Sequence, residues 1–517
     1  MIQKSTTVQK REVAVIDVGS TAIRMAIAEI DSLGNWKIID RLNKPIPLGK
    51  NVFLNSKISR ELMIQSVKIL AGYKEVLRGW QIDKNNVKAI ATSALRDAVN
   101  SDTFIDQMAV RTGFKISIIE GIEENRLTYL AVQYALRNIK HELSRSNSVI
   151  IEVGGGSTEF MFLQRGKIKA AHSFNIGTVR IEEQIKYAPT GSDYMYRFLN
   201  DRIQAMFDVL DSELELKRIR HFIAVGGHMR LTATKIGGKE EEMYKIIEKR
   251  QFEDFVFDIQ HLSVEDLVSR LQISYNDAEG LLTSLLTYLI FFERTSANQI
   301  IIPNVSIREG MLVNMTMGPD PLVKREFYSQ IIASAVGIGR KYHFDENHAT
   351  HVASLALKLF DNLKEEHGMI PHARLLLEVS AILHDIGSYV RFSGHHKHGQ
   401  YLINNSEIFG LNRDDVKIIS NVVRYHRKAM PSSAHSSYTS LPWEDRIRVL
   451  KLSAMLRVAD ALDRSHTRRI GNLNIEKTKD EVILKCDCQG DISLERLALS
   501  AKGAMFEEVF GLKVVLV

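Results

Sequence analysis

Two short segments rich in glycine and hydroxyl residues carry the residue types that bind phosphate. The first, DVGST at residues 17–21, and the second, EVGGGST at residues 152–158, each lie between two apolar runs. Glycine permits close backbone approach and positive φ, so successive N–H groups can converge on an anion. The leading acids, Asp17 and Glu152, can hold a divalent cation or a water beside that phosphate. Two such turns predict a phosphorylated ligand clamped between two lobes.

Further polar residues follow two other apolar runs and extend this candidate site. Thr92, Ser93 and Arg96 stand where a strand is expected to pass into a helix, so hydroxyls, amides and a guanidinium could together bind phosphate. Glu123 and Glu124 follow Gly121, and a carboxylate there could orient and deprotonate an attacking water. Taken singly, paired Glu residues at a helix start complement the helix dipole, and an Arg makes a surface ion pair. Together with both glycine turns, they favour a catalytic site.

The order of apolar runs predicts two successive α/β lobes that would position these residues. Alternating strands and helices are typical of an α/β domain with a mixed or parallel sheet. In the first lobe, two strands are expected within residues 13–30, on either side of the glycine turn, and further strands at 37–43, 87–92 and 116–120. Helices are expected at 60–80 and 123–139. In the second, strands are expected at 148–153, 159–163 and 222–225, and helices at 194–214 and 277–292. We place these lobes at residues 1–138 and 139–320.

After the segment MGPDP at residues 317–321, whose Gly and Pro residues interrupt regular secondary structure, the sequence pattern predicts consecutive helices. Apolar residues recur at helical spacing in VASLALKLFDNL, ARLLLEVSAIL and RIRVLKLSAMLRVADAL. This periodicity predicts an all-α domain over residues 321–468. Short alternating segments return from residue 470 and predict a small α/β C-terminal module over residues 469–517.

Composition limits the class of protein. A formal charge of +6 favours polyanionic partners, while the absence of interleaved basic and aromatic residues argues against nucleic acid. The cysteines, Cys486 and Cys488, are expected as free thiols, with a metal pair as the alternative, which implies a reducing compartment. The N-terminus lacks a secretion signal, and the apolar run at residues 281–292 is too short for a bilayer. We therefore expect a soluble, cytoplasmic protein without a membrane partner.

Six segments follow one another in an order that resembles the exopolyphosphatase and guanosine pentaphosphate phosphatase family. They are DVGSTAIRMAIA, ATSALRDA, EGIEENRL, IEVGGGSTEF, NIGTVRIEE and VSIREGML. That family belongs to the actin-like ATPase superfamily, so the resemblance implies two actin-like, ribonuclease H-like lobes. It also implies Mg2+-assisted hydrolysis of a terminal phosphate from inorganic polyphosphate or from guanosine pentaphosphate (pppGpp), in a homodimer.

The resemblance implies a role for each matching residue. Glu124 corresponds to the catalytic base, and Glu159 to a second acidic residue of the active site, while Asp17 and Glu152 would hold Mg2+. The implied phosphate-binding residues are Gly19, Ser20, Ser93, Arg96, Gly155, Gly156, Ser157 and Thr158. Because a phosphoryl-transfer transition state spreads charge over oxygens, positioning and fixed donors would supply most of the catalysis.

Two positions depart from the family pattern. Glu152 stands where relatives usually have Asp, and its extra methylene would shift the metal or water. His228, in AVGGHMR, stands where many relatives have a small hydroxyl residue, and it would either contact substrate or serve as a structural histidine.

The helical domain also contains a pattern that resembles the HD metal-dependent phosphohydrolase superfamily. Imidazoles and carboxylates on different helices can converge inside a bundle. The implied ligands of a second divalent metal in this HD-type domain are His348, His384, Asp385 and Asp460, with His396, His398 and His426 available for a further metal position. The alternative is an architectural domain without metal. The basic cluster at residues 391–398 could line a polyanion path or form a solvated loop.

The leading expectation is an exopolyphosphatase, a hydrolase of phosphoric anhydride bonds. The alternatives are a pppGpp 5′-phosphohydrolase and, because of Glu152, a regulatory protein that senses (p)ppGpp or polyphosphate with little turnover. Actin-like sugar kinases are disfavoured because the EGIEEN and REG segments fit the phosphatase pattern better.

Overall fold

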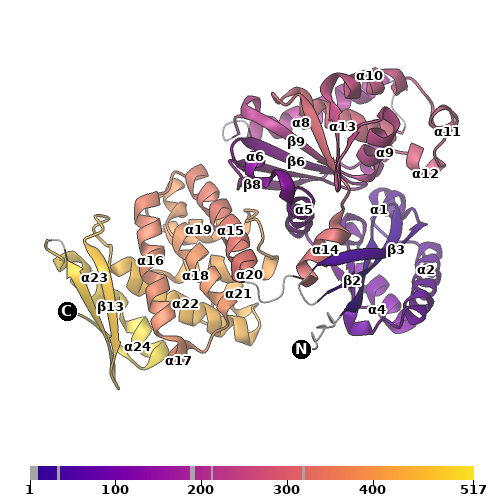
Figure 1. Ribbon diagram of the computed structural model, residues 1–517. Helices are drawn as coiled ribbons and strands as arrows, with labels where there is room; N and C mark the ends of the chain where they lie inside the picture. The colour runs from indigo at the N-terminus through magenta and orange to yellow at the C-terminus, as the bar shows by residue number, and fades with distance from the viewer. Residues whose placement is uncertain (1–9, 32–34, 187–191, 211–213, 317–320, 489) are drawn as a thin grey trace, which may run out of the picture. The chain divides into compact units, whose positions relative to one another are not determined.

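The chain divides into two units, residues 1–325 and residues 326–517 (Figure 1). The computed structural model describes residues 10–31, 35–186, 192–210, 214–316, 321–488 and 490–517. Each unit has its own sheets, helices and hydrophobic core.

The first lobe of unit 1 is a five-stranded mixed sheet in the order β3-β2-β1-β4-β5. Strands β1 (Arg11–Val18), β2 (Ala22–Ile30) and β3 (Trp36–Pro45) form an antiparallel meander. Strands β4 (Val87–Ala91) and β5 (Ile116–Ile118) continue the sheet in parallel with β1. Residues 13–18 are all buried, which explains why β1 reads as a continuous apolar run.

The second lobe repeats this topology. Strands β6 (Asn147–Val153), β7 (Thr158–Gln164) and β8 (Lys167–Phe174) form the meander, and β9 (Ile219–Val225) and β12 (Gln299–Pro303) continue it in parallel. The resulting order, β8-β7-β6-β9-β12, has the same sequence of directions as the first sheet, and β11 (Tyr244–Glu248) and β10 (Lys239–Glu240) extend it. The predicted pair of α/β lobes is confirmed.

Helices cover both sheets of unit 1. Their bounds are α1 (Leu48–Asn55), α2 (Arg60–Gly79), α3 (Ser93–Asp97), α4 (Ser101–Thr112), α5 (Gly121–Ala135), α6 (Lys140–Leu143), α7 (Thr178–Ile185), α8 (Ser192–Leu210), α9 (Gly227–Ile236), α10 (Lys249–Ile259), α11 (Val264–Leu271), α12 (Tyr275–Ala278), α13 (Leu281–Glu293) and α14 (Ile307–Thr316). The helix predicted from residue 277 begins at Leu281, because Gly280 has φ of 74° and separates α12 from α13.

Helices α5 and α14 pack at unusually close range. A Cβ at Gly310 of α14 would lie 2.0 Å from the carbonyl oxygen of Leu127 on α5, so only glycine fits there. This contact fixes the helix that carries Glu124 against the segment that carries Arg308 and Glu309.

Unit 2 is a helical bundle with a small sheet. Its helices are α15 (Pro321–Lys341), α16 (Glu346–Asn362), α17 (Lys364–His367), α18 (Pro371–Leu383), α19 (His395–Asn404), α20 (Arg413–Tyr425), α21 (Ser436–Thr439), α22 (Trp443–Ala461), α23 (Ser493–Lys502) and α24 (Ala504–Phe510). The sheet has the order β13-β14-β15, formed by β13 (Ile470–Lys477), β14 (Glu481–Cys488) and β15 (Lys513–Leu516).

The sheet of unit 2 shares one hydrophobic core with the bundle. Leu376 and Met455 from the helices belong to the same buried cluster as Val482 and Leu484 from β14 and Phe506 from α24. The expected C-terminal module is therefore present as secondary structure but has no separate core. The three boundaries between the four domains expected from the sequence remain predictions.

The cysteines differ from expectation. Cys486 and Cys488 form a disulfide with each other on β14, where residues two apart share one face of the strand. The prediction of two free thiols is wrong, and the expected reducing compartment loses that support. Within the described ranges, the helices are all too short or too polar to cross a membrane.

Candidate functional site

The two glycine-rich turns of unit 1 face each other across a cleft with a volume of about 570 Å3. Both turns are closed in the same way: the N–H of Gly19 donates to the oxygen of Ala22 at 3.0 Å, and that of Gly154 to the oxygen of Ser157 at 2.9 Å. A Cβ on Gly155 would lie only 3.0 Å from the Cβ of Ser20. The two equivalent turns therefore approach each other closely on opposite sides of the cleft.

Most of the residues predicted for the site line this cleft. They are Asp17, Gly19, Ser20, Ser93, Glu124, Glu152, Gly155, Ser157 and Glu159. Arg96, Gly156 and Thr158 are not among the lining residues. Gly156 packs so closely that a Cβ would lie 2.3 Å from Ser93 Oγ, and Thr158 donates its hydroxyl to the oxygen of Ile176. Their predicted phosphate contacts remain predictions.

Glu124 lies in the first turn of α5, where it is buried and held by Arg96. One guanidinium nitrogen, Nη1 of Arg96, donates to Glu124 Oε1 at 2.6 Å and to the oxygen of Ile119 at 2.7 Å. Burial raises the pKa of Glu124 to about 7, while Arg96 opposes that rise and the charges of Glu152 and Asp17 add to it. A carboxyl with this pKa is suited to accept a proton near neutral pH.

Glu159 on β7 is the second buried carboxyl of the cleft floor. Its Oε1 accepts a hydrogen bond from Ser173 Oγ at 2.9 Å. Burial, followed by the negative charges of Glu124 and Glu152, raises its pKa well above the ordinary value. Both carboxyls of the cleft floor are therefore easier to protonate than an ordinary glutamate.

Asp17 and Glu152 end equivalent strands, β1 and β6, and their pKa values are also raised by burial. Arg24 lies 4.0 Å from Asp17, and Thr128 Oγ1 donates to Glu152 Oε2 at 2.5 Å. The longer side chain of Glu152 is thus held by a hydroxyl on α5. Oxygen donors of this kind fit Mg2+, which takes one or two carboxylates together with substrate phosphates and waters.

Four cations that line the cleft were not among the predicted site residues. They are Arg24, Lys50, Arg230 and Arg308. Arg230 is anchored by a 2.7 Å bond from Nη1 to the oxygen of Val305, and Lys50 pairs with Glu279. The three arginines stand as single cations inside apolar segments, RMAIAEI, GGHMRL and VSIREGML, and that isolation is the signal that could have identified them.

The composition of the cleft changes from floor to rim. His228 lines it, and burial lowers its pKa to about 4, so this imidazole is neutral near pH 7. The rim includes Tyr275, Asn276 and Asp277, all exposed. Asp17, Glu124, Glu159 and Arg308 of the lining are buried, Arg24 and Lys50 are partly exposed, and an aromatic ring, an amide and a carboxylate stand at the exposed edge.

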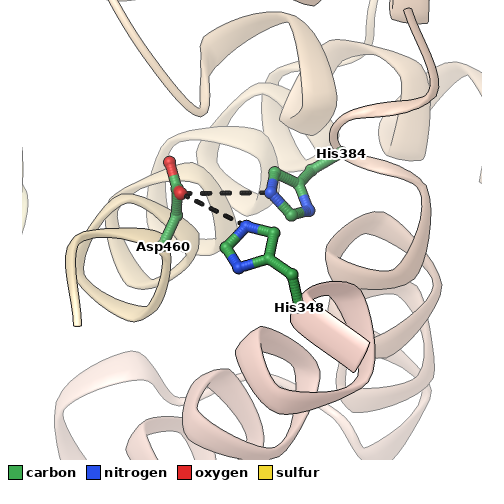
Figure 2. Close-up of side chains that lie close together, drawn as sticks. All are labelled: His348, His384 and Asp460. Carbon is green, nitrogen blue, oxygen red and sulfur yellow. Dashed lines mark ion pairs between the residues drawn. The ribbon is translucent and has the colours of Figure 1, made fainter. Parts of the chain in front are cut away.

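A second cluster of ionisable side chains lies in unit 2. Figure 2 shows His348 from α16, His384 from the end of α18 and Asp460 from α22 pointing toward one another. Asp460 Oδ1 lies 3.9 Å from each histidine Nε2, and Asp385 Oδ2 lies 3.6 Å from His384 Nε2. The four residues predicted as HD-type ligands therefore come together.

Of the three further histidines named from the sequence, His426 faces Asp385, whereas His396 and His398 do not. His395, which was not named among them, takes their place beside Asp385. His396 and His398 instead line a separate cavity of about 480 Å3. Its other lining residues include Lys397, Arg424, Lys428 and His435.

Comparison with known proteins agrees with this geometry. Residues 26–317 match the Ppx/GppA phosphatase family, and residues 332–501 match Ppx/GppA phosphatase, domain III. The chain belongs to the Ppx/GppA phosphatase family. Its Ppx/GppA region contains Glu124, Glu152 and Glu159 of the cleft floor, while Asp17 lies just before the matched residues.

Among curated relatives in this Ppx/GppA family, a protein of Pseudoalteromonas translucida is 26% identical over 469 residues, covering 87% of each chain. A protein of Photobacterium profundum is 24% identical over 458 residues, covering 86% of each. Both are named guanosine-5′-triphosphate,3′-diphosphate pyrophosphatase.

Among solved structures, an exopolyphosphatase from Cytophaga hutchinsonii ATCC 33406 has a TM-score of 0.53 at 19% identity, covering 59% of this chain and 98% of that one. The Aquifex aeolicus Ppx/GppA family member has a TM-score of 0.49 at 22% identity, covering 61% and 99%. The predicted family and fold class, two actin-like α/β lobes followed by a helical region, are confirmed.

Proposed function

We propose that this chain hydrolyses the terminal 5′ phosphoanhydride bond of pppGpp in a Mg2+-dependent reaction. The observation that carries the proposal is the order of groups in the cleft. Buried carboxyls and four cations line the cleft, and a tyrosine, an amide and a carboxylate stand at its exposed edge. A triphosphate fits inward, with its nucleoside toward the entrance.

The reaction uses the floor residues in separate roles. Glu124, with a pKa of about 7, accepts a proton from the attacking water, and Arg96 keeps that carboxylate oriented. The glycine-rich turns and Arg24 face the transferring phosphate, whose charge grows on its outer oxygens. Asp17 and Glu152 would hold Mg2+, which neutralises phosphate charge when bound.

Nucleoside recognition favours pppGpp over a simple phosphate chain. Guanine presents two adjacent N–H donors that a carboxylate can accept, and Asp277, which lines the cleft as Tyr275 does, supplies a carboxylate whose Oδ2 accepts from Ser274 Oγ. The same carboxylate, together with Glu279 and Glu182, would repel a long polyanion at the entrance. The names of the full-length relatives support the same substrate.

Inorganic polyphosphate, the leading expectation from the motifs, becomes the second candidate. The observation in its favour is the set of four cations, Arg24, Lys50, Arg230 and Arg308, in the cleft interior. These cations would contact phosphate groups of either substrate.

The test compares phosphate release from pppGpp, long-chain polyphosphate and tripolyphosphate, each with Mg2+ and with EDTA. We expect Mg2+-dependent release that is fastest from pppGpp and is lost in Glu124→Gln. Release only from polyphosphate would overturn the nucleotide assignment. No release from any substrate would favour the sensor alternative, and full activity of Glu124→Gln would refute the base.

Rim variants test the nucleoside assignment separately. Base stacking on an aromatic side chain contributes about 1–3 kcal/mol, so Tyr275→Ala should raise KM for pppGpp roughly 5- to 160-fold. KM for tripolyphosphate should not change, because that substrate has no base. Tyr389→Ala, an exposed tyrosine of unit 2, is the matched control. An equal rise of KM for both substrates would mean that Tyr275 does not contact guanine.

A further inference from the structure

The cavity of about 480 Å3 in unit 2 has a lining of its own. Its described lining shares no residue with the cluster of histidines and aspartates around Asp385. The side chains come from the start of α19, from the end of α20 and from the loop that follows α20. Small-molecule sites usually have volumes of about 300–1,000 Å3, so the cavity is large enough for a small ligand. The lining residues are Ser393, Gly394, His396, Lys397, His398, Arg424, Tyr425, Lys428, Ala429 and His435.

The two helices direct different residues to the cavity and to the cluster. On α19, His395 faces Asp385, whereas the next residue, His396, lines the cavity. Near the end of α20, Arg427 Nη1 lies 3.3 Å from His395 Nε2, whereas Arg424 lines the cavity. The cavity is therefore a separate candidate site with its own chemistry.

The lining of the cavity is positively charged. Its cations are Lys397, Arg424 and Lys428, and none of the described lining residues is acidic. In the part of the chain that the structure describes, none of these three cations forms an ion pair with a carboxylate. By contrast, Arg374 on the surface of the same unit pairs with Asp361 at 2.9 Å. Cations gathered without counter-charges repel one another, and a bound anion would relieve that repulsion.

Uncharged donors at the start of α19 add to these cations. The first amides of a helix have no acceptor within the helix, and Gly394 is the residue before the first turn of α19. Because Ser393, Gly394 and His396 all line the cavity, the positive end of this helix lies beside it. His396 is 5% exposed, and among the described residues its Nδ1 has no hydrogen-bond partner. In the tautomer with a proton on Nδ1, this nitrogen would donate to an anion.

The backbone holds Lys428 beside the cavity in an uncommon conformation. Its φ of 58° lies in the left-handed region. Arg457 of α22 fixes this turn, because Nη2 donates to the oxygens of Lys428 and Ala429 at 2.7 and 2.9 Å. Its Nε donates to the oxygen of Tyr425 at 2.7 Å, which neutralises a carbonyl at the end of α20 that would otherwise repel an anion. Backbone strain that the surrounding structure maintains is common at ligand-binding sites.

We propose that this cavity binds a small anion with two linked phosphate groups, either free pyrophosphate or the diphosphate of a nucleotide. A single phosphate group carries a charge of about −1.5 to −2 near pH 7, which is less than the charge of the three cations. Two linked groups match it better. Lys397 and Lys428 contact the phosphate oxygens as point charges, and Arg424 binds two oxygens at once. The site is independent of the cleft in unit 1 and does not rest on the function proposed for that cleft.

The first experiment locates pyrophosphate on the full-length protein. Backbone hydrogen exchange is followed by mass spectrometry as pyrophosphate is added, with EDTA present so that the Mg2+-dependent reaction of the cleft cannot consume the ligand. We expect slower exchange in residues 393–398 and 424–429, and the half-maximal concentration gives Kd. This local signal is distinct from any change at the glycine-rich turns of unit 1. Unchanged exchange in both segments at millimolar pyrophosphate would overturn the proposal.

Variants test the cations of the cavity in the same assay. A hydrogen bond to a charged group is lost in Arg424→Gln, so Kd for pyrophosphate should rise roughly 10- to 150-fold, and less in Arg424→Lys. Lys428→Gln, which changes an exposed side chain, should also raise Kd. The matched control is Lys479→Gln, an exposed lysine of unit 2 outside the lining, and its Kd should not change. Equal Kd values in Lys428→Gln and Lys479→Gln would refute the role of the cavity. Circular dichroism and elution volume verify that each variant is folded.

A comparison of ligands identifies the source of the diphosphate. The same titration is made with ADP, GDP, orthophosphate and long-chain polyphosphate. Equal affinity for pyrophosphate and the nucleotides would support free diphosphate recognition, and tighter binding of ADP or GDP would support a nucleotide. Orthophosphate that binds as tightly as pyrophosphate would refute a diphosphate site. Protection by long-chain polyphosphate alone would also overturn the proposal, because it would indicate a path for a polymer.

Discussion

The contact between Arg96 and Glu124 makes a quantitative prediction about the pH dependence of the cleft reaction. The Nη1–Oε1 distance is 2.6 Å, and both side chains are largely buried, at 18% and 11% exposure. A hydrogen bond to a charged group contributes about 1.5–3 kcal/mol, and about 1.4 kcal/mol corresponds to one pH unit. Arg96→Gln should therefore raise the pKa of Glu124 from about 7 by roughly one to two pH units.

A raised pKa moves activity to higher pH, because Glu124 acts as a base only when ionised. At pH 7 about half of the wild-type carboxyl is ionised, against roughly 1–10% in Arg96→Gln. kcat/KM at pH 7 should fall about 5- to 50-fold and recover as the pH approaches 9. The assay measures kcat/KM for pppGpp as a function of pH. The acid limb of that profile reports the pKa of Glu124 in the free enzyme.

Two results would separate this account from a direct phosphate contact. Arg96→Lys retains the positive charge, so its acid limb should move less than that of Arg96→Gln. If the acid limb of Arg96→Gln stays near pH 7 while the plateau drops, Arg96 acts on the substrate and the reasoning from the Glu124 contact fails.

Three further predictions concern stability and metal binding. Gly310→Ala should destabilise unit 1 by about 3 kcal/mol in urea unfolding, because its Cβ would lie 2.0 Å from Leu127 O. The control Gly72→Ala, with open space around its Cβ in α2, should stabilise by about 0.5–1 kcal/mol. Glu159→Gln should gain stability over the wild type as the pH rises above 4.5, the ordinary pKa of a glutamate side chain. A raised carboxyl pKa makes the folded state bind more protons, so wild-type stability falls as the pH rises above that value; a constant difference would contradict it. Asp463→Ala removes the acceptor of His348 Nδ1 and should weaken binding of a divalent metal such as Mn2+ by the His348, His384 and Asp460 cluster about 10- to 100-fold in an equilibrium titration, whereas unchanged affinity would count against that role.

Local patterns in the sequence predicted the floor of the cleft well. Asp17 and Glu152 end strands whose apolar runs are continuous, and the glycine turns that follow depend on only a few neighbouring residues. Glu124 could be placed at a helix start because Gly121 and a strand precede it. Such features are encoded within a few residues of one another, so they can be read without the tertiary fold.

Features that depend on tertiary packing were missed. The hydrogen bond from Arg96 to Glu124, which joins α3 to α5, was not predicted, while the expected phosphate contact of Arg96 remains a prediction. Arg230 and Arg308 enter the cleft from segments far apart in the chain. In the run HHKH, only the rotational phase of α19 decides that His395 faces Asp385 while His398 lines another cavity. The disulfide on β14 was missed because free thiols are the commoner state of an isolated pair.

The core that the bundle of unit 2 shares with β13, β14 and β15 has a consequence for how this unit unfolds. Since Val482 and Leu484 pack in the same cluster as Leu376 and Met455, neither part can melt without exposing the other. Residues 326–517 should therefore lose structure in a single cooperative step, with helix and sheet signals sharing one midpoint. Truncation after residue 468 would remove the part of this shared core that β13, β14, β15 and α24 supply. The apolar side chains left in the bundle would then be exposed, which favours aggregation over a smaller folded domain.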